Sequence, residues 1–163
     1  MLRAPELSDV NDIYEWENSP DRLLHGRTGL PYSKLSIRDY IDNYNATALD
    51  SGHLRFIIDN AGVAIGLIEL YDLDLSASKA FVSIFIAPAH RNKKHASEAL
   101  DELTCFTRNH LGLQRLCAVV SVENIPSLKL FHNASFQEIA SLPDWVRSLQ
   151  GNLIDAKLLI RNI

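Results

Sequence analysis

Residues 84–100 have the sequence Ile84-Phe85-Ile86-Ala87-Pro88-Ala89-His90-Arg91-Asn92-Lys93-Lys94-His95-Ala96-Ser97-Glu98-Ala99-Leu100 and carry the main structural signal of the chain. Their opening residues are apolar and β-branched or aromatic, which predicts the end of a buried strand. A short polar loop follows, and from Lys94 apolar residues recur at three- and four-residue spacings, as on one face of a helix. The first turn of a helix leaves backbone N–H groups without partners, and its dipole favours negative charge. This junction is therefore a candidate site for a phosphate group.

The loop between this strand and this helix is rich in basic residues. It carries Arg91, Lys93 and Lys94, with His90 and His95 close by. Together with the N–H groups of the helix start, these side chains would hold a diphosphate well. A basic loop that is merely solvated explains the same residues, so both interpretations stay open at this point.

The residues before this segment predict three strands joined by hairpins. Residues 54–58 and 63–71 flank the turn Asp59-Asn60-Ala61-Gly62. Residues 80–86 follow a second turn region and are nearly all apolar, β-branched or aromatic. We therefore expect a central strand that is buried on both faces. Strands that are joined by hairpins pair antiparallel.

The residues that follow the basic loop predict two helices and three strands. In chain order we expect a helix that ends at Gly112, a strand at residues 113–121, a short helix capped by Asn124, and strands at residues 136–142 and 153–160. The strand–helix–strand unit that spans residues 80–121 predicts a parallel strand pair with a right-handed crossover.

The first third of the chain predicts mainly helices. In order, we expect a short strand at residues 1–5, a helix capped by Ser8 or Asp9, an irregular loop at residues 23–32, and a helix capped by Ser33 or Ser36 that runs through Asn43. The full order of elements predicts an α/β (α+β) fold, in which a central mixed, mostly antiparallel sheet is flanked by helices on both faces.

The composition indicates a single soluble domain over residues 1–163. Hydrophobic residues make up 47% and charged residues 22%, and we find no internal repeat or linker. The formal net charge of -4 argues against a nucleic-acid-binding surface, which would need a basic stripe. No apolar run reaches membrane-spanning length and the first residues lack a signal-peptide core, so we expect no membrane association and a cytoplasmic location.

We expect no metal site in this chain. Cys105 and Cys117 form no CxxC pair, and each is expected to fill the core. His90 and His95 are five residues apart, a spacing that no helical face brings together around an ion.

Several motifs in order give the chain a resemblance to a known family. The segment Ala87-Pro88 followed by Arg91-x-x-x-x-Ala96 resembles the acyl-CoA pyrophosphate loop of the GNAT superfamily of N-acetyltransferases. Asn124-x-x-Ser127-x-x-x-Phe131-x-x-x-Ser135-Phe136 is similar to the second motif of that family. Gly66-Leu67-Ile68-Glu69-Leu70 resembles the branch that acetylates spermidine, spermine or ribosomal proteins. The resemblance covers essentially the whole chain and implies a GNAT-like fold.

The resemblance implies an enzyme that transfers an acetyl group from acetyl-CoA to a primary amine. The acceptor would be a polyamine-like small amine or an amine of a protein or peptide, and the protein would assemble as a homodimer or a higher homo-oligomer. Three positions depart from the family pattern: its loop glycine is Lys94, its tyrosine general acid is Phe131, and the glutamate of its central strand is Phe81. The alternative is therefore a catalytically weak acyl-CoA-binding regulatory module.

The resemblance also implies where the coenzyme binds. The cofactor-binding candidates lie at the end of the central strand, in the basic loop, at the helix start and in the second motif: Phe85, Ile86, Arg91, Asn92, Lys93, Lys94, His95, Ala96, Ser97, Asn124 and Ser127. A backbone N–H near Ile86 would polarise the thioester carbonyl. Asn124 can equally be a plain helix N-cap.

The catalytic candidates are Glu69, Tyr71 and Ser83, as bases or as residues that hold a water molecule. Glu69 and Tyr71 share one strand face because side chains alternate with a two-residue period. Glu69 can equally be an edge or surface carboxylate, and a packed aromatic is the favoured interpretation of Tyr71. The substrate-binding candidates are Glu17, Tyr32 and Glu69.

One further departure concerns the acceptor amine. Gly29 and Leu30 stand where polyamine-acetylating members of the family tend to carry an acidic pair before Pro-Tyr. This difference weakens the expectation of a polyamine substrate.

Overall fold

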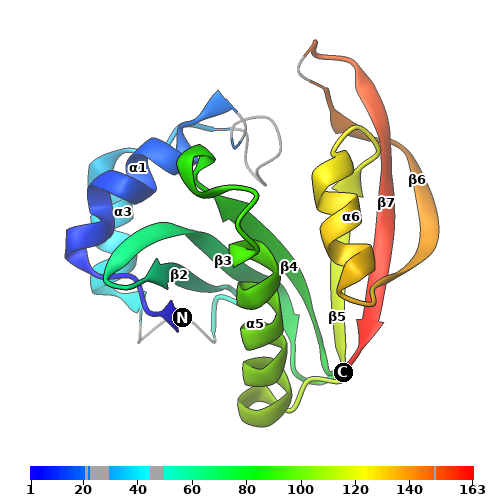
Figure 1. Cartoon of the computed structure of the whole chain (residues 1–163), viewed down its shortest axis with the longest axis horizontal. Coiled ribbons are helices and arrows are strands. Elements are labelled where there is room, and N and C mark those ends of the chain that lie inside the picture. The colour runs from blue at the N-terminus through cyan, green and yellow to red at the C-terminus, as the bar shows by residue number, and fades with distance from the viewer. Residues whose placement is uncertain (21, 23–29, 45–49, 149) are drawn as a thin grey trace.

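A computed structural model describes residues 1–20, 22, 30–44, 50–148 and 150–163. Seven strands form one sheet in the order β1-β2-β3-β4-β5-β7-β6 (Figure 1). The strands are β1 (Leu2–Arg3), β2 (Leu54–Asn60), β3 (Val63–Asp74), β4 (Lys79–Ile86), β5 (Arg115–Ser121), β6 (Gln137–Arg147) and β7 (Leu153–Asn162). The described α-helices are α1 (Val10–Glu17), α3 (Lys34–Asp42), α5 (His95–Leu111) and α6 (Ile125–Asn133).

The order and direction of the strands confirm the mixed, mostly antiparallel sheet. β2, β3 and β4 pair antiparallel through hairpins, and β4 pairs parallel with β5 after the crossover through α5. Most strands differ by a few residues from their predicted bounds, β1 and β6 among them. β1 is only two residues long. β6 continues to Arg147, because an irregularity between Leu142 and Val146 that contains Pro143 is followed by renewed pairing with β7.

Helices cover both faces of the sheet, as predicted. Ile57, Leu67 and Phe85 pack in one cluster with the apolar residues Ile13 and Trp16 of α1. The residues next to them along the strands point to the other face, where they pack against α5; these are Ile58, Ile68 and Ile86. This alternation follows from the two-residue period of a strand and separates an α1/α3 side from an α5 side.

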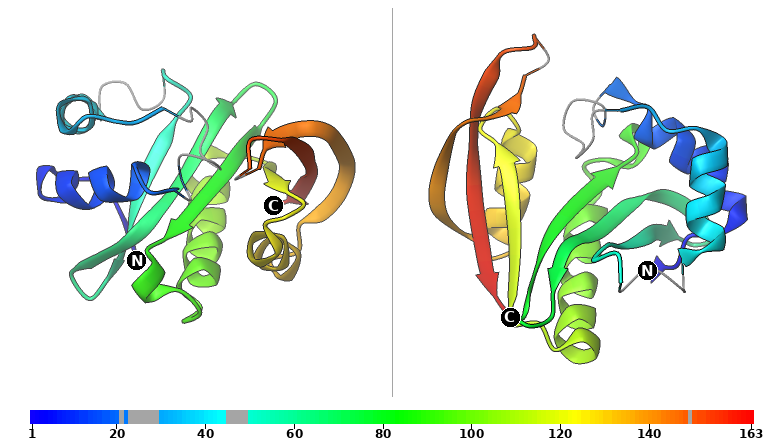
Figure 2. Two further views of the ribbon diagram at one scale, coloured as in Figure 1. Left: turned by 90° about the horizontal axis from the view of Figure 1, so that it is seen from above. Right: turned by 180° about the vertical axis from the view of Figure 1, so that it is seen from behind.

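β4 and β5 stay together over only a short distance. Their paired residues are Lys79–Phe81 of β4 and Arg115–Cys117 of β5. Figures 1 and 2 show the two strands side by side near the C-terminus and well apart at their other ends. The expected central position of the strand is confirmed, but its burial on both faces holds only in part: Phe85 and Ile86 are buried on opposite faces. Ser83 and Ile84 are only partly buried, since β5 has left this edge of the strand.

No helix in the described part of the chain is long and apolar enough to cross a membrane. The described residues also contain no group of three or more His, Cys, Asp or Glu side chains that could hold a metal ion.

Candidate active site

The loop from β4 to α5 has an unusual backbone. Pro88–His90 form a 3-10 turn, and Asn92 and Lys94 have φ angles of 61° and 67°. Lys94 is the N-cap residue of α5, in the left-handed conformation and without a side-chain capping hydrogen bond. In a turn, a left-handed residue next to a right-handed one makes successive backbone N–H groups converge. Such N–H groups form a concave site that can bind an anion. The position where the family has glycine thus has a backbone conformation that glycine favours.

The basic side chains of this loop partly fold back onto it. Arg91 Nε donates to the carbonyl of Ile86 at 2.9 Å, and its guanidinium lies 5.6 Å from the centre of the Phe85 ring. Lys93 Nζ donates to the carbonyl of Ala89 at 3.1 Å. Arg91 therefore holds together the end of β4 and the loop that follows it.

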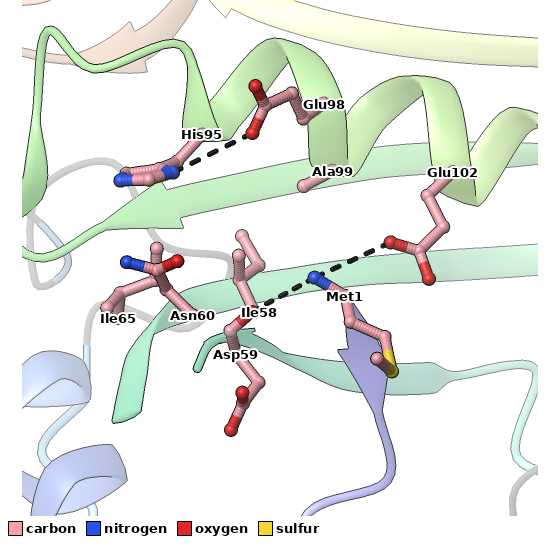
Figure 3. Close-up of a pocket in the computed structure, with 9 residues that line it drawn as sticks. All are labelled: Met1, Ile58, Asp59, Asn60, Ile65, His95, Glu98, Ala99 and Glu102. Carbon is pink, nitrogen blue, oxygen red and sulfur yellow. Dashed lines mark hydrogen bonds and ion pairs between the residues drawn. The ribbon is translucent and has the colours of Figure 1, made fainter. Parts of the chain in front are cut away.

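His95 lies apart from the other candidates of this loop. Its Nδ1 is 3.8 Å from Glu98 Oε2, and its ring lines a small pocket between α5 and the β2–β3 hairpin (Figure 3). Asn60, Met1 and Glu102 line the same pocket. The side chain of His95 is thus directed toward the hairpin.

Beyond Phe81, where β5 separates from β4, one edge of β4 presents backbone groups that do not pair with β5. The N–H of Ala87 donates to the carbonyl of Ile65, so Ala87 faces β3. Because strand residues alternate in direction, Ile84 and Ile86 direct their backbone groups to the opposite edge. This is the edge that faces away from β3, toward the region between β4 and β5, where an extended ligand could add alongside β4.

The close approach of β3 and β4 near this point depends on Gly66. Gly66 lies opposite Ile86 in the sheet. A Cβ atom on residue 66 would lie 2.2 Å from the carbonyl oxygen of Phe85 and 3.1 Å from the Cα atom of Ile86. Because glycine has no Cβ atom, the backbone at the end of β4 can lie this close to β3.

The second family motif lies on α6 and on the turn that follows it. Asn124 Oδ1 accepts from the Ser127 N–H at 3.2 Å, which confirms the helix N-cap interpretation of Asn124. Phe131 is only 2% exposed, and its ring packs edge-to-face on Phe136 with 4.9 Å between ring centres. The residue at the position of the family's tyrosine is therefore part of the core and has no hydroxyl to donate.

Four charged side chains form a buried cluster on the α1/α3 side, which we call the tetrad: Glu17, Arg22, Arg55 and Glu69. Arg22 Nη2 lies 3.1 Å from Glu17 Oε1 and 2.9 Å from Glu69 Oε1. Arg55 Nη2 lies 2.7 Å and 3.0 Å from the same two oxygens. Glu17 and Glu69 are 5% and 3% exposed, so each guanidinium bridges two buried carboxylates.

The tetrad connects directly to β4 and to His53. Arg22 Nη1 donates to the hydroxyl oxygen of Ser83 at 3.2 Å, and His53 Nε2 lies 3.3 Å from Glu69 Oε2. Burial by itself would raise the pKa of Glu69. The guanidiniums of Arg55 and Arg22 outweigh this effect and hold the pKa well below its ordinary value. Glu69 is therefore ionised at neutral pH and a weak proton acceptor.

The structure thus changes the interpretation of two candidates. Glu69 is neither an edge nor a surface carboxylate, because β2 and β4 flank it and the two arginines cover its charge. Glu17 is likewise paired, so it presents no open carboxylate. Sequence reasoning missed Arg22 and Arg55. The available signal was Arg55 itself, a charged residue between the apolar neighbours Leu54 and Phe56.

The remaining candidates are placed by aromatic and backbone contacts. Tyr71 stacks on Phe81 with 5.4 Å between ring centres, so the packed-aromatic interpretation is confirmed. The backbone of Tyr32 is held to the end of α1, since its N–H donates to Asn18 Oδ1 at 2.9 Å and its carbonyl accepts from Asn18 Nδ2 at 3.0 Å. Gly29 lies outside the described residues, whereas Leu30 is exposed.

Comparison with known proteins places this architecture in a family. The model of the acetyltransferase (GNAT) domain matches residues 1–137. An uncharacterised N-acetyltransferase p20 of Bacillus licheniformis is 30% identical over 94% of this chain and 87% of its own length. A spermidine N(1)-acetyltransferase of Vibrio cholerae is 28% identical over 84% of this chain and 78% of its own length.

Solved structures agree over nearly the whole chain. A crystal structure of spermidine N-acetyltransferase from Vibrio cholerae in complex with CoA and spermine has a TM-score of 0.86 and 25% identity, and covers 99% of this chain and 94% of its own. A dodecameric structure of spermidine N-acetyltransferase from the same organism has a TM-score of 0.82 and 26% identity, with 99% and 92% coverage. This chain therefore belongs to the GNAT acetyltransferase family and catalyses acetyl-CoA-dependent N-acetylation of an amine.

Proposed function

We propose that acetyl-CoA lies along the β5-facing edge of β4 and that its acetyl group passes to the primary amine of a small molecule. The observation that carries this proposal is the separation of β4 from β5 after Phe81. It leaves a strand edge at Ile84 and Ile86 that leads directly to the helix start at Lys94. One end of an extended coenzyme would thus meet backbone groups, and its diphosphate would meet the N–H groups of the loop.

The proposed coenzyme contacts follow this path. Phe85 and Ile86 flank the thioester, and the Ile86 N–H polarises its carbonyl. The loop and the first turn of α5 receive the diphosphate through Arg91, Asn92, Lys93, Lys94, Ala96 and Ser97. Asn124 and Ser127 of the second motif contact the pantetheine arm from the other side. His95 contributes its backbone N–H, because its side chain is directed toward the β2–β3 hairpin.

The reaction is a direct transfer. A neutral amine attacks the thioester carbonyl, the C–S bond breaks, the amine nitrogen loses a proton, and the thiolate of CoA gains one. A free alkyl ammonium has a pKa of about 10.4, so a proton must leave the amine before attack. Ser83 and the hydroxyl of Tyr71 are proposed to hold the amine or a water molecule that carries this proton to solvent, and Glu69 is proposed to position Arg22 beside Ser83. Positioning of the two reactants supplies much of the rate.

Because Phe131 carries no hydroxyl, the proton for the leaving thiolate is proposed to come from solvent. The names of the relatives make a polyamine one candidate acceptor and a homo-oligomer the expected assembly. A cytoplasmic location also stays a prediction of the sequence.

The proposal is tested by two measurements on the full chain. Amide resonances of residues 91–97 are expected to shift on titration with CoA. A thiol-release assay with monoamines, polyamines, amino-acid amides and peptides is expected to show turnover with at least one small amine. Resonances that do not move at saturating CoA would refute the binding site. Tight CoA binding without thiol release from any amine would instead refute the reaction.

Lys94→Gly is expected to stabilise the protein. A residue other than glycine costs about 1–2 kcal/mol in the left-handed conformation. The extra backbone entropy of glycine offsets about 0.5–1 kcal/mol of this gain. We therefore expect urea denaturation to show a net gain of roughly 0.5–1 kcal/mol, with unchanged or tighter CoA binding in calorimetry.

Lys94→Ala is the matched control for this variant, since it removes the charge but keeps the left-handed backbone. It should not gain stability. A large loss of CoA affinity in both variants would show that the ammonium of Lys94 itself contacts phosphate.

A further inference from the structure

We propose that the acceptor amine of this enzyme carries a single positive charge, and that Arg22 sets this preference. The inference rests on the proposed function, because it concerns the amine that reaches β4. It follows from the tetrad, in which Arg22 reaches Ser83 and both carboxylates are already neutralised by two guanidiniums.

The formal charge of the tetrad is zero. Both of its carboxylates are shared between both arginines, and His53 adds either no charge or a positive one. The other buried carboxylate in the described part of the chain, Asp9, is paired with Arg3 at 2.7 Å. A second ammonium group on the acceptor would thus find no uncompensated buried carboxylate among these residues, although a buried cation requires one.

Arg55, a member of the tetrad, has a hydrogen-bond donor without an acceptor. Two buried atoms in the described part of the chain have no hydrogen-bond partner, Arg55 Nε and Tyr40 Oη. Arg55 lies over Tyr40, with 5.3 Å between its guanidinium and the ring centre. Because an ammonium group only donates hydrogen bonds, a second one could not satisfy Arg55 Nε.

In sequence, the stretch between α1 and α3 contains no excess of acidic residues. Residues 18–33 contain one acid, Asp21, and two arginines, Arg22 and Arg27. Arg22 reaches the hydroxyl of Ser83, two residues before Phe85 on the strand that would hold the thioester. A guanidinium thus lies within hydrogen-bond distance of Ser83, beside the proposed reaction centre, where it repels a second cationic group.

The test compares two amines of equal length, hexylamine and hexamethylenediamine. We expect kcat/KM from thiol release to favour hexylamine by at least about tenfold, after correction for the two equivalent ends of the diamine. A diamine that is acetylated as well as the monoamine, or better, would overturn the inference. If neither these nor any other amine releases thiol although CoA binds, the proposed reaction itself fails, and the inference with it.

Arg22→Gln tests the role assigned to the arginine. It leaves Glu17 and Glu69 with one guanidinium between them, so the diamine should gain at least about tenfold relative to the monoamine. Arg22→Lys keeps the charge and should keep the preference of the wild type. The CoA-induced rise in melting temperature shows that each variant is folded. An unchanged ratio in folded Arg22→Gln would overturn the role of Arg22, and if that variant does not fold, the wild-type comparison decides.

Discussion

Gly66→Ala is expected to destabilise the protein by about 3 kcal/mol, at the upper end of the range for overpacked interiors. The new Cβ atom would lie 2.2 Å from the carbonyl oxygen of Phe85, and that oxygen belongs to the backbone of a central strand. The end of β4 must then shift, and with it Ile86 and the start of the basic loop. Since a displacement of this kind disturbs reactant positions, we also expect kcat/KM to fall by about 10²-fold. Urea denaturation and thiol release measure the two effects.

Gly62→Ala separates crowding from backbone conformation. Gly62 has a φ angle of +83° in the β2–β3 turn, and a Cβ atom there meets nothing within 4 Å. This control should lose about 1 kcal/mol through the left-handed conformation alone and keep its activity. Equal losses for both variants would contradict the assigned role of Gly66 in the contact between β3 and β4.

Much of the fold is predictable because local patterns and tertiary packing agree. The apolar stripe of α5 and the hairpin turn at residues 59–62 need only neighbouring residues to be recognised. The extent of β6 is not predictable in this way. Pro143-Asp144 signals a turn in the sequence, and Asp144 is left-handed in the structure, yet pairing with β7 resumes after them. That pairing depends on a partner strand that follows later in the chain.

The same distinction, between residues that are contiguous in sequence and residues that only packing brings together, applies to the candidate site. The strand, basic loop and helix start of the proposed coenzyme side were predictable, because they are contiguous in sequence. The surroundings of Glu69 were not, because they come from positions 17, 22, 53 and 55. A glutamate in a strand gives no sign of whether it faces solvent, an amine or two arginines. Only the packing of α1 against β2, β3 and β4 decides this.

The tetrad therefore has a structural role as well as a proposed one in specificity. It joins α1 and Arg22 to three adjacent strands on the face that lies opposite α5. A buried ion pair adds little stability compared with apolar residues of similar volume, but removal of one partner leaves an uncompensated charge. The tetrad thus fixes the position of α1 over Ser83, and this makes its members sensitive to substitution.

Glu69→Gln is expected to cost about 3–5 kcal/mol in the free energy of unfolding at neutral pH. The variant keeps the shape of the side chain but leaves Arg22 and Arg55 with Glu17 as their one carboxylate partner in the tetrad. Glu138→Gln is the matched control. Glu138 pairs with Lys157 at 2.7 Å on the surface, where such a pair contributes about 0–1 kcal/mol. Urea denaturation of both variants gives the comparison, and similar losses would contradict the buried character of the Glu69 pairs.

The difference in the free energy of unfolding between wild type and Glu69→Gln should depend on pH, which provides a second test. The pKa of Glu69 in the folded protein lies below the ordinary value of 4.5, so folding favours its ionised form. Its contribution is complete above pH 4.5 and is lost as the pH falls from there toward the folded pKa. The stability gap between wild type and Glu69→Gln should therefore narrow in acid, and a gap that widens there would contradict the assignment.

Adding Arg22→Gln to Glu69→Gln restores the charge balance of the tetrad. The double variant retains Glu17 and Arg55 as one compensated pair, so its loss should be clearly smaller than the sum of the two single losses. Residues in one ion-pair network couple by about 0.5–3 kcal/mol in such cycles. Strict additivity would mean that Arg22 and Glu69 do not interact energetically. The preference for a singly charged amine would then need an origin outside the tetrad.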